Sequence, residues 1–138
     1  MNRLLVCAAA LAFIVGLVHS VLGEALIFRR MRTGGVVPTN GGRVIGEGHV
    51  RILWASWHVL TALGWCIAAI LLWLAIEPAA PAAPAAPAAA AASSRFISNT
   101  IVVAMLAGSA LVLVGTKARH PGWIGLLGVA VLTWFATA

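Results

Sequence analysis

The segment RILWASWHVLTALGW, residues 51–65, opens the longest apolar run in the chain. Polar and aromatic residues recur in it at steps of three and four, which places them on one face of an α-helix. These residues are Arg51, Trp54, His58, Thr61 and Trp65. An ionisable side chain in a membrane segment usually faces the protein interior. We therefore expect this stripe to line the inside of a helical membrane protein.

The composition of the whole chain supports a membrane protein. Of its 138 residues, 62% are hydrophobic and only 9% are charged, and the mean hydropathy is +1.05. A soluble domain carries about 25% charged residues. The net charge of +6 comes from basic residues beside apolar runs, where they act as topology signals and contact anionic lipid headgroups. The expected partner is therefore the lipid bilayer and not a nucleic acid.

The apolar runs predict an all-α membrane protein, in which four transmembrane helices form an antiparallel bundle of two hairpins within one integral membrane domain. The expected helices cover about residues 4–24, 50–76, 96–115 and 121–137. The last of them is short and only just spans. Cys7 and Cys66 lie within apolar runs and lack disulfide or metal-ligand spacing. We expect both to be small buried hydrophobic residues.

The first apolar run resembles a signal peptide in having a basic residue before it, but no small-x-small cleavage site follows. Residues 4–23 would span about 30 Å as a helix, so we expect an uncleaved transmembrane segment. Its small residues recur about every fourth position and predict a groove for close helix approach. They are Ala8, Ala12, Gly16, Ser20 and Gly23.

Residues 78–95 form a segment rich in proline and alanine, with prolines at positions 78, 81, 84 and 87. A proline at every third position opposes helix formation and favours an extended polyproline-II conformation. We expect a flexible linker between the two hairpins that carries no chemistry.

The distribution of basic residues predicts the orientation of the helices. The loops after the first and third helices, with the helix ends beside them, hold Arg29, Arg30, Arg32, Arg43, Arg51, Lys117 and Arg119. The opposite side holds Arg3 and Arg95. By the positive-inside rule the arginine-rich loop lies in the cytoplasm and both termini lie outside, most naturally in a bacterial cytoplasmic membrane.

This topology brings the polar residues to one side of the membrane. His19 and His58 lie about 7 and 10 Å inside their helix ends, at nearly matching depths. We expect them to approach one another beneath a rim of Glu24, Arg51 and His120. The candidate ligand-binding residues are His19, Glu24, Arg51, Trp54, His58 and His120.

Two functions fit this cluster. In the first, the protein is an accessory or assembly subunit of a larger membrane complex or homo-oligomer, and Glu24 pairs with Arg51 to fix helix packing. In the second, a one-sided pocket holds a haem, metal, quinone or lipid, with His19 and His58 as candidate metal ligands. Ser20 adjoins His19 but cannot pair with it as nucleophile and base, because adjacent helical residues point about 100° apart. No catalytic residue is assigned.

A third alternative is an oligomeric small transporter. The length and the number of helices are similar to those of small multidrug resistance transporters. The sequence departs from that family in two places, because Glu24 falls at the end of the first helix instead of mid-membrane and the proline-alanine segment is foreign to the pattern.

Overall fold

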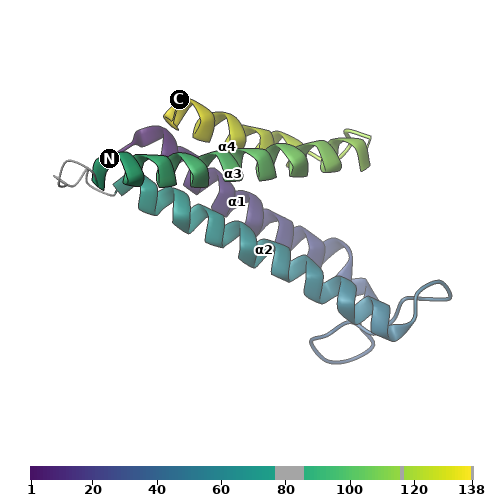
Figure 1. Ribbon diagram of the computed structural model, residues 1–138. Coiled ribbons are helices and arrows are strands. Elements are labelled where there is room, and N and C mark those ends of the chain that lie inside the picture. Colours follow the sequence, from purple (N-terminus) through teal and green to yellow (C-terminus); the bar gives the residue numbers. More distant parts are fainter. Residues whose placement is uncertain (77–85, 116, 138) are drawn as a thin grey trace.

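The computed structural model describes residues 1–76, 86–115 and 117–137, and these are helical for most of their length (Figure 1). The elements are α1 (Arg3–Leu26), the 3-10 turn η1 (Phe28–Met31), α2 (Glu47–Ile76), α3 (Ala86–Gly115) and α4 (Gly122–Thr137). The expectation of an all-α chain with four helices is confirmed.

Three of the helical segments are long and apolar enough to cross a membrane, namely Arg3–Met31, Glu47–Ile76 and Ala91–Val114. The fourth helix, α4, has 16 residues, which gives it a length of about 24 Å against the roughly 30 Å of a bilayer core. Of the four expected membrane-spanning helices, three are therefore long enough to cross a membrane.

The helix α3 begins at Ala86, ten residues before the expected start at 96. Residues 86–95 are thus helical, although we expected them to belong to the extended linker. Alanine is the strongest helix former, and proline is tolerated in the first turn of a helix, where Pro87 lies. Positions 78–85 of the predicted linker lie outside the described residues.

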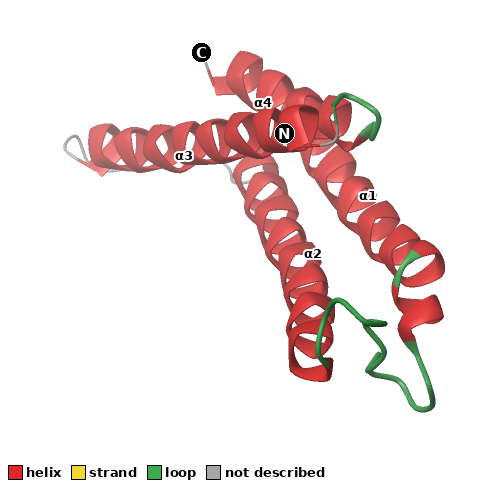
Figure 2. Cartoon of the chain, turned by 90° about the vertical axis from the view of Figure 1, so that its right-hand side faces the viewer, coloured by secondary structure: helices red, strands yellow, loops and turns green. Residues whose placement is uncertain are grey.

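The helices form two antiparallel pairs, α1 with α2 and α3 with α4. The pairs meet mainly through α1 and α4, whereas α2 and α3 barely touch. Figures 1 and 2 show that the two pairs cross at an angle, so that their loop-bearing ends diverge. The buried core lies where the pairs cross and is built from Leu5, Ala8, Ala9, Ala12, Ala68, Leu71, Ala75, Ile101 and Val129.

The amino-terminal end of α1 is fixed at this crossing by Asn2. Its side-chain oxygen accepts hydrogen bonds from the backbone N–H groups of Leu4 and Leu5, which caps the helix. Its backbone N–H donates to the carbonyl of Ala75 at 2.9 Å, and its side-chain amide donates to the carbonyl of Ala136 at 3.0 Å. One residue thus ties α1 to the carboxyl ends of α2 and α4.

Cys7 and Cys66 are exposed free cysteines, so the expectation that they are buried is wrong. Both lie in membrane-length segments. A small apolar side chain there can face lipid at no cost, because lipid tails are as apolar as a protein core.

Candidate functional site

Two tryptophans of α2 pack against the small residues of α1. Trp57 faces Gly23, and Trp65 faces Gly16. A Cβ atom added at Gly23 would collide with the Trp57 ring. Both indole N–H groups donate to backbone carbonyls of α1: Trp57 to His19 at 3.0 Å and Trp65 to Phe13 at 3.3 Å. Glycine in the groove of α1 therefore lets bulky rings approach closely enough to bond the opposite backbone.

Aromatic contacts extend from Trp57 in two directions. Its ring is stacked on the imidazole of His19, with ring centroids 4.2 Å apart and planes 7° from parallel. The buried ring of Phe28, on η1, meets Trp57 edge-on with centroids 5.6 Å apart. Such contacts stabilise beyond the area that they bury. Trp57 therefore joins α1, η1 and α2 at one point.

Ser20 of α1 and His58 of α2 form a hydrogen bond between their side chains, with Oγ and Nδ1 2.7 Å apart. The hydroxyl donates to Nδ1 when the imidazole is neutral and carries its proton on Nε2. Trp54 meets the same imidazole edge-on, with centroids 5.0 Å apart. Ser20 thus pairs with a histidine of the facing helix and not with the adjacent His19. We call His19, Ser20, Gly23, Phe28, Trp54, Trp57 and His58 the polar junction.

The charged residues at the loop end of α1 and α2 pair differently from our expectation. Glu24 forms an ion pair with Arg32, and Arg51 forms one with Glu47 at 2.6 Å. The suggested pair of Glu24 and Arg51 is therefore wrong. Arg32 is turned back toward Glu24 by the loop that follows η1, while Glu47 lies one helical turn before Arg51 on the same face of α2.

His120 belongs to the turn between α3 and α4. Its Nδ1 accepts a hydrogen bond from the backbone N–H of Gly122 at 3.1 Å. Both His120 and His58 lie within electrostatic range of His19. Within residues 1–76, 86–115 and 117–137, no group of three or more His, Cys, Asp or Glu side chains is arranged to hold a metal ion.

The structure places three of the six candidate residues inside the polar junction: His19, Trp54 and His58. Glu24 lies at its loop side, whereas His120 belongs to the turn of the other helix pair and bonds Gly122 there. Arg51 is exposed and turned toward Glu47.

Trp57, Ser20, Gly23 and Phe28 were missed as members of this site. Spacing carried a signal for Trp57: it precedes Trp65 by eight residues, close to the seven that separate Gly16 from Gly23 on the antiparallel helix. Two bulky rings and two glycines at matching intervals are complementary when the helices lie antiparallel.

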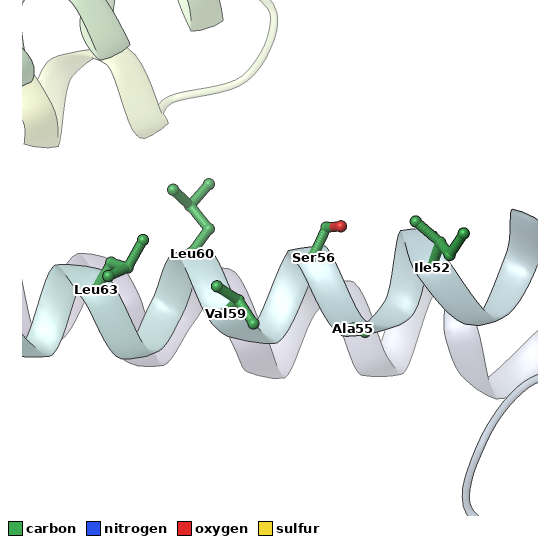
Figure 3. Close-up of a pocket in the computed structure, with 6 residues that line it drawn as sticks. All are labelled: Ile52, Ala55, Ser56, Val59, Leu60 and Leu63. Carbon is green, nitrogen blue, oxygen red and sulfur yellow. The ribbon is translucent and has the colours of Figure 1, made fainter.

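Two shallow hollows on the surface lie away from the histidines. Figure 3 shows the first, on an exposed face of α2, where all six lining side chains come from that one helix. They are Ile52, Ala55, Ser56, Val59, Leu60 and Leu63. The second lies between α1 and α2, beside Phe13 and Trp65, and is lined by apolar residues. Both are open apolar surface of the kind that lipid or another helix covers.

Two atoms of the polar junction are buried without a hydrogen-bond partner among the described residues. They are Nε2 of His19 and Nε1 of Trp54. A buried polar atom without a partner costs about 1–3 kcal/mol. The junction therefore retains two unused hydrogen-bonding positions.

The three membrane-length helices and their apolar exteriors define a small polytopic membrane protein. The chain matches no protein-family model, no curated protein and no solved structure.

Proposed function

We propose that this protein is an accessory or assembly subunit of the bacterial inner membrane. Its polar junction holds α1 against α2 near the cytoplasmic face, and its apolar outer faces serve a larger membrane complex. The proposal rests on the observation that polar groups of the junction form hydrogen bonds with one another within the chain. Ser20 bonds His58, and the indole of Trp57 bonds the backbone of His19.

This arrangement favours a structural role for the cluster. A binding or catalytic pocket is a concavity into which a few polar groups converge. Here the hydroxyl of Ser20 and the indole N–H of Trp57 cross between two helices, and the hollow drawn in Figure 3 is lined almost entirely by apolar side chains. Polar side chains that bond across helices are a common means of fixing helix pairs in membranes.

The exposed apolar surface supports a role in a complex. Only 22–28% of each membrane-length window is buried within the chain. On the face of α2 drawn in Figure 3, Ile52 is 66% exposed and Leu60 is 60% exposed. Because α3 barely touches α2, this face is open to lipid and to helices of other subunits.

The proposed orientation follows the basic residues. The excess of arginine and lysine lies in the loop between α1 and α2 and in the turn between α3 and α4, which connect the helices within each pair. The positive-inside rule places these connections in the cytoplasm and both termini outside.

Purification from the native membrane in mild detergent tests the proposal. The expected result is a complex of fixed stoichiometry, whose other subunits assemble poorly when the gene for this chain is deleted. The variant Ser56→Trp, which adds bulk to the face in Figure 3, should release the chain from that complex. The matched variant Ala110→Trp, on an exposed face of α3, should remain bound. A chain that purifies alone, with assembly of other complexes unchanged by the deletion, would refute the proposal.

The unpartnered atoms of His19 and Trp54 favour a second candidate function, a membrane-embedded site for a haem, metal, quinone or lipid. Imidazole nitrogen is a common ligand of haem iron and of metals, and an indole N–H can donate to a carbonyl oxygen. An absorption spectrum and metal analysis of the purified protein test this candidate. A Soret band or stoichiometric metal that disappears in His19→Ala would support it over the structural role.

A further inference from the structure

The loop between η1 and α2, residues 32–46, is folded on itself. The backbone N–H groups of Thr39 and Asn40 both donate to the carbonyl of Met31, at 3.0 and 2.8 Å. The guanidinium Nε of Arg32 donates to the carbonyl of Val36 at 2.6 Å. Gly41 forms an isolated antiparallel bridge with Ile45. The loop thus has a defined shape and presents particular side chains outward.

Several of the outward side chains are apolar. Val44 is 92% exposed and Val36 is 74% exposed. Just before the loop, Leu26 and Ile27 are exposed at the end of α1. The membrane-length segment of α1 and η1 ends at Met31 and that of α2 begins at Glu47, so these side chains lie at or between the ends of two such segments. Apolar side chains at that level contribute to binding by entering the interface.

Three arginines close in sequence to these apolar residues have no acidic partner among the described residues. Glu24 is paired with Arg32 and Glu47 with Arg51. Arg29, Arg30 and Arg43 are exposed and form no ion pair within the described part of the chain. Arg43 directly precedes Val44, so a cationic and an apolar side chain are adjacent in the loop.

We propose that residues 29–46 dock onto an anionic leaflet of the bilayer, with Arg29, Arg30 and Arg43 binding the phosphates of anionic phospholipids and Val36 and Val44 inserting between the headgroups. The guanidinium group suits this role, because its fork of donors matches phosphate oxygens. The two internal ion pairs engage Arg32 and Arg51 and leave Arg29, Arg30 and Arg43 for the lipid. This docking surface is independent of the proposed role as a subunit.

The test uses the full chain in lipid nanodiscs, with a fluorophore on V44C in a background carrying Cys7→Ala and Cys66→Ala. Discs contain either phosphatidylglycerol mixed with phosphatidylcholine or phosphatidylcholine alone. Both faces of a disc carry the same lipids, so the orientation of the chain does not matter. The expected result in anionic discs is a blue-shifted emission that is quenched by lipids spin-labelled near the headgroup and reversed by high salt.

The variant R29Q/R30Q/R43Q should lose this insertion, by about fivefold for each arginine removed. The control R3Q/R95Q, with charges at the other end of the helices, should behave like the parent. Equal helicity of all variants by circular dichroism shows that they are folded. An emission typical of water in anionic discs, or insertion unchanged in the triple variant, would overturn the proposal. So would the same spectral change on adding inorganic phosphate to phosphatidylcholine discs, because that would identify a site for free anions.

Discussion

Trp57 contacts both the side chain and the backbone of His19. The two rings lie 4.2 Å apart between centroids and 7° from parallel, and the indole N–H donates to the carbonyl of His19 at 3.0 Å. This pair of contacts fixes the rotation of α2 relative to α1, because a turn of either helix would break one of them. The relationship depends on Gly23, which leaves the space that the indole occupies.

Gly23→Ala should therefore lower the free energy of unfolding strongly. The added Cβ would collide with the Trp57 ring, and overpacking of this kind typically costs 1–3 kcal/mol. Gly64→Ala is the matched control, because a Cβ there meets nothing within 4 Å and alanine favours a helix by about 1 kcal/mol. Unfolding of the purified variants in mixed detergent measures both. Equal stability of the two variants would contradict the close approach at Gly23.

Ser20→Ala should destabilise the helix pair by about 0.5–1.5 kcal/mol, because it leaves Nδ1 of His58 without its donor. Ser98→Ala is the opposite case. Ser98 is 1% exposed and its hydroxyl has no partner among the described residues, so its removal should be neutral or stabilising. The same unfolding assay compares them, and an unchanged stability of Ser20→Ala would show that the Ser20 bond contributes little.

The two ion pairs should differ in how much they contribute to the stability of the protein. The side chains of Glu24 and Arg32 are 33% and 26% exposed, against 59% and 52% for Glu47 and Arg51. An exposed pair one turn apart on a helix contributes about 0.3–0.5 kcal/mol. Glu24→Gln should therefore reduce stability more than Glu47→Gln, and 1 M salt should erase the smaller effect first.

The turn between α3 and α4 contains two residues with positive φ that are not glycine, Lys117 at 51° and Ala118 at 61°. This left-handed conformation costs a residue with a Cβ roughly 1 kcal/mol. Ala118→Gly should raise stability by up to about that amount. Gly35, at φ 80° with open space around it, is the reverse control, so Gly35→Ala should lower stability. Opposite signs in thermal unfolding would confirm the conformational cause.

Replacement of the junction histidines should be less well tolerated than replacement of a polar residue outside the junction. His19→Ala removes the ring stacked on Trp57, and His58→Ala removes the partner of Ser20. Ser93 is exposed on α3, so Ser93→Ala should be neutral. A mutational scan that scores folded protein in the membrane checks this ranking, and equal scores for the three variants would count against the junction.

Much of the fold is determined by hydropathy and periodicity. Apolar runs of 20 residues or more can only be stable in a bilayer as helices, since every backbone group must bond within the segment. Helical spacing also decides which residues share a face. Of the stripe from Arg51 to Trp65 that we expected to line the inside, Trp54, His58 and Thr61 are at least partly buried, whereas Arg51 and Trp65 are exposed. The start of α3 at Ala86 was not predicted, because we gave the proline pattern more weight than the strong helix preference of the alanine run.

Tertiary structure alone decided the partners of these residues. Helical periodicity says nothing about how far the opposite helix is rotated or shifted, so Trp57 was not distinguished from the neighbouring Trp54. The loop after η1 brings Arg32 to Glu24, so that Arg51 pairs with Glu47 instead. The path of this loop could not be predicted, because a loop rich in glycine has no periodicity. Composition and hydropathy thus predict a helical membrane protein. The packing of Trp57 between Gly23 and His19 required the tertiary structure, because it depends on the register of two helices joined by that loop.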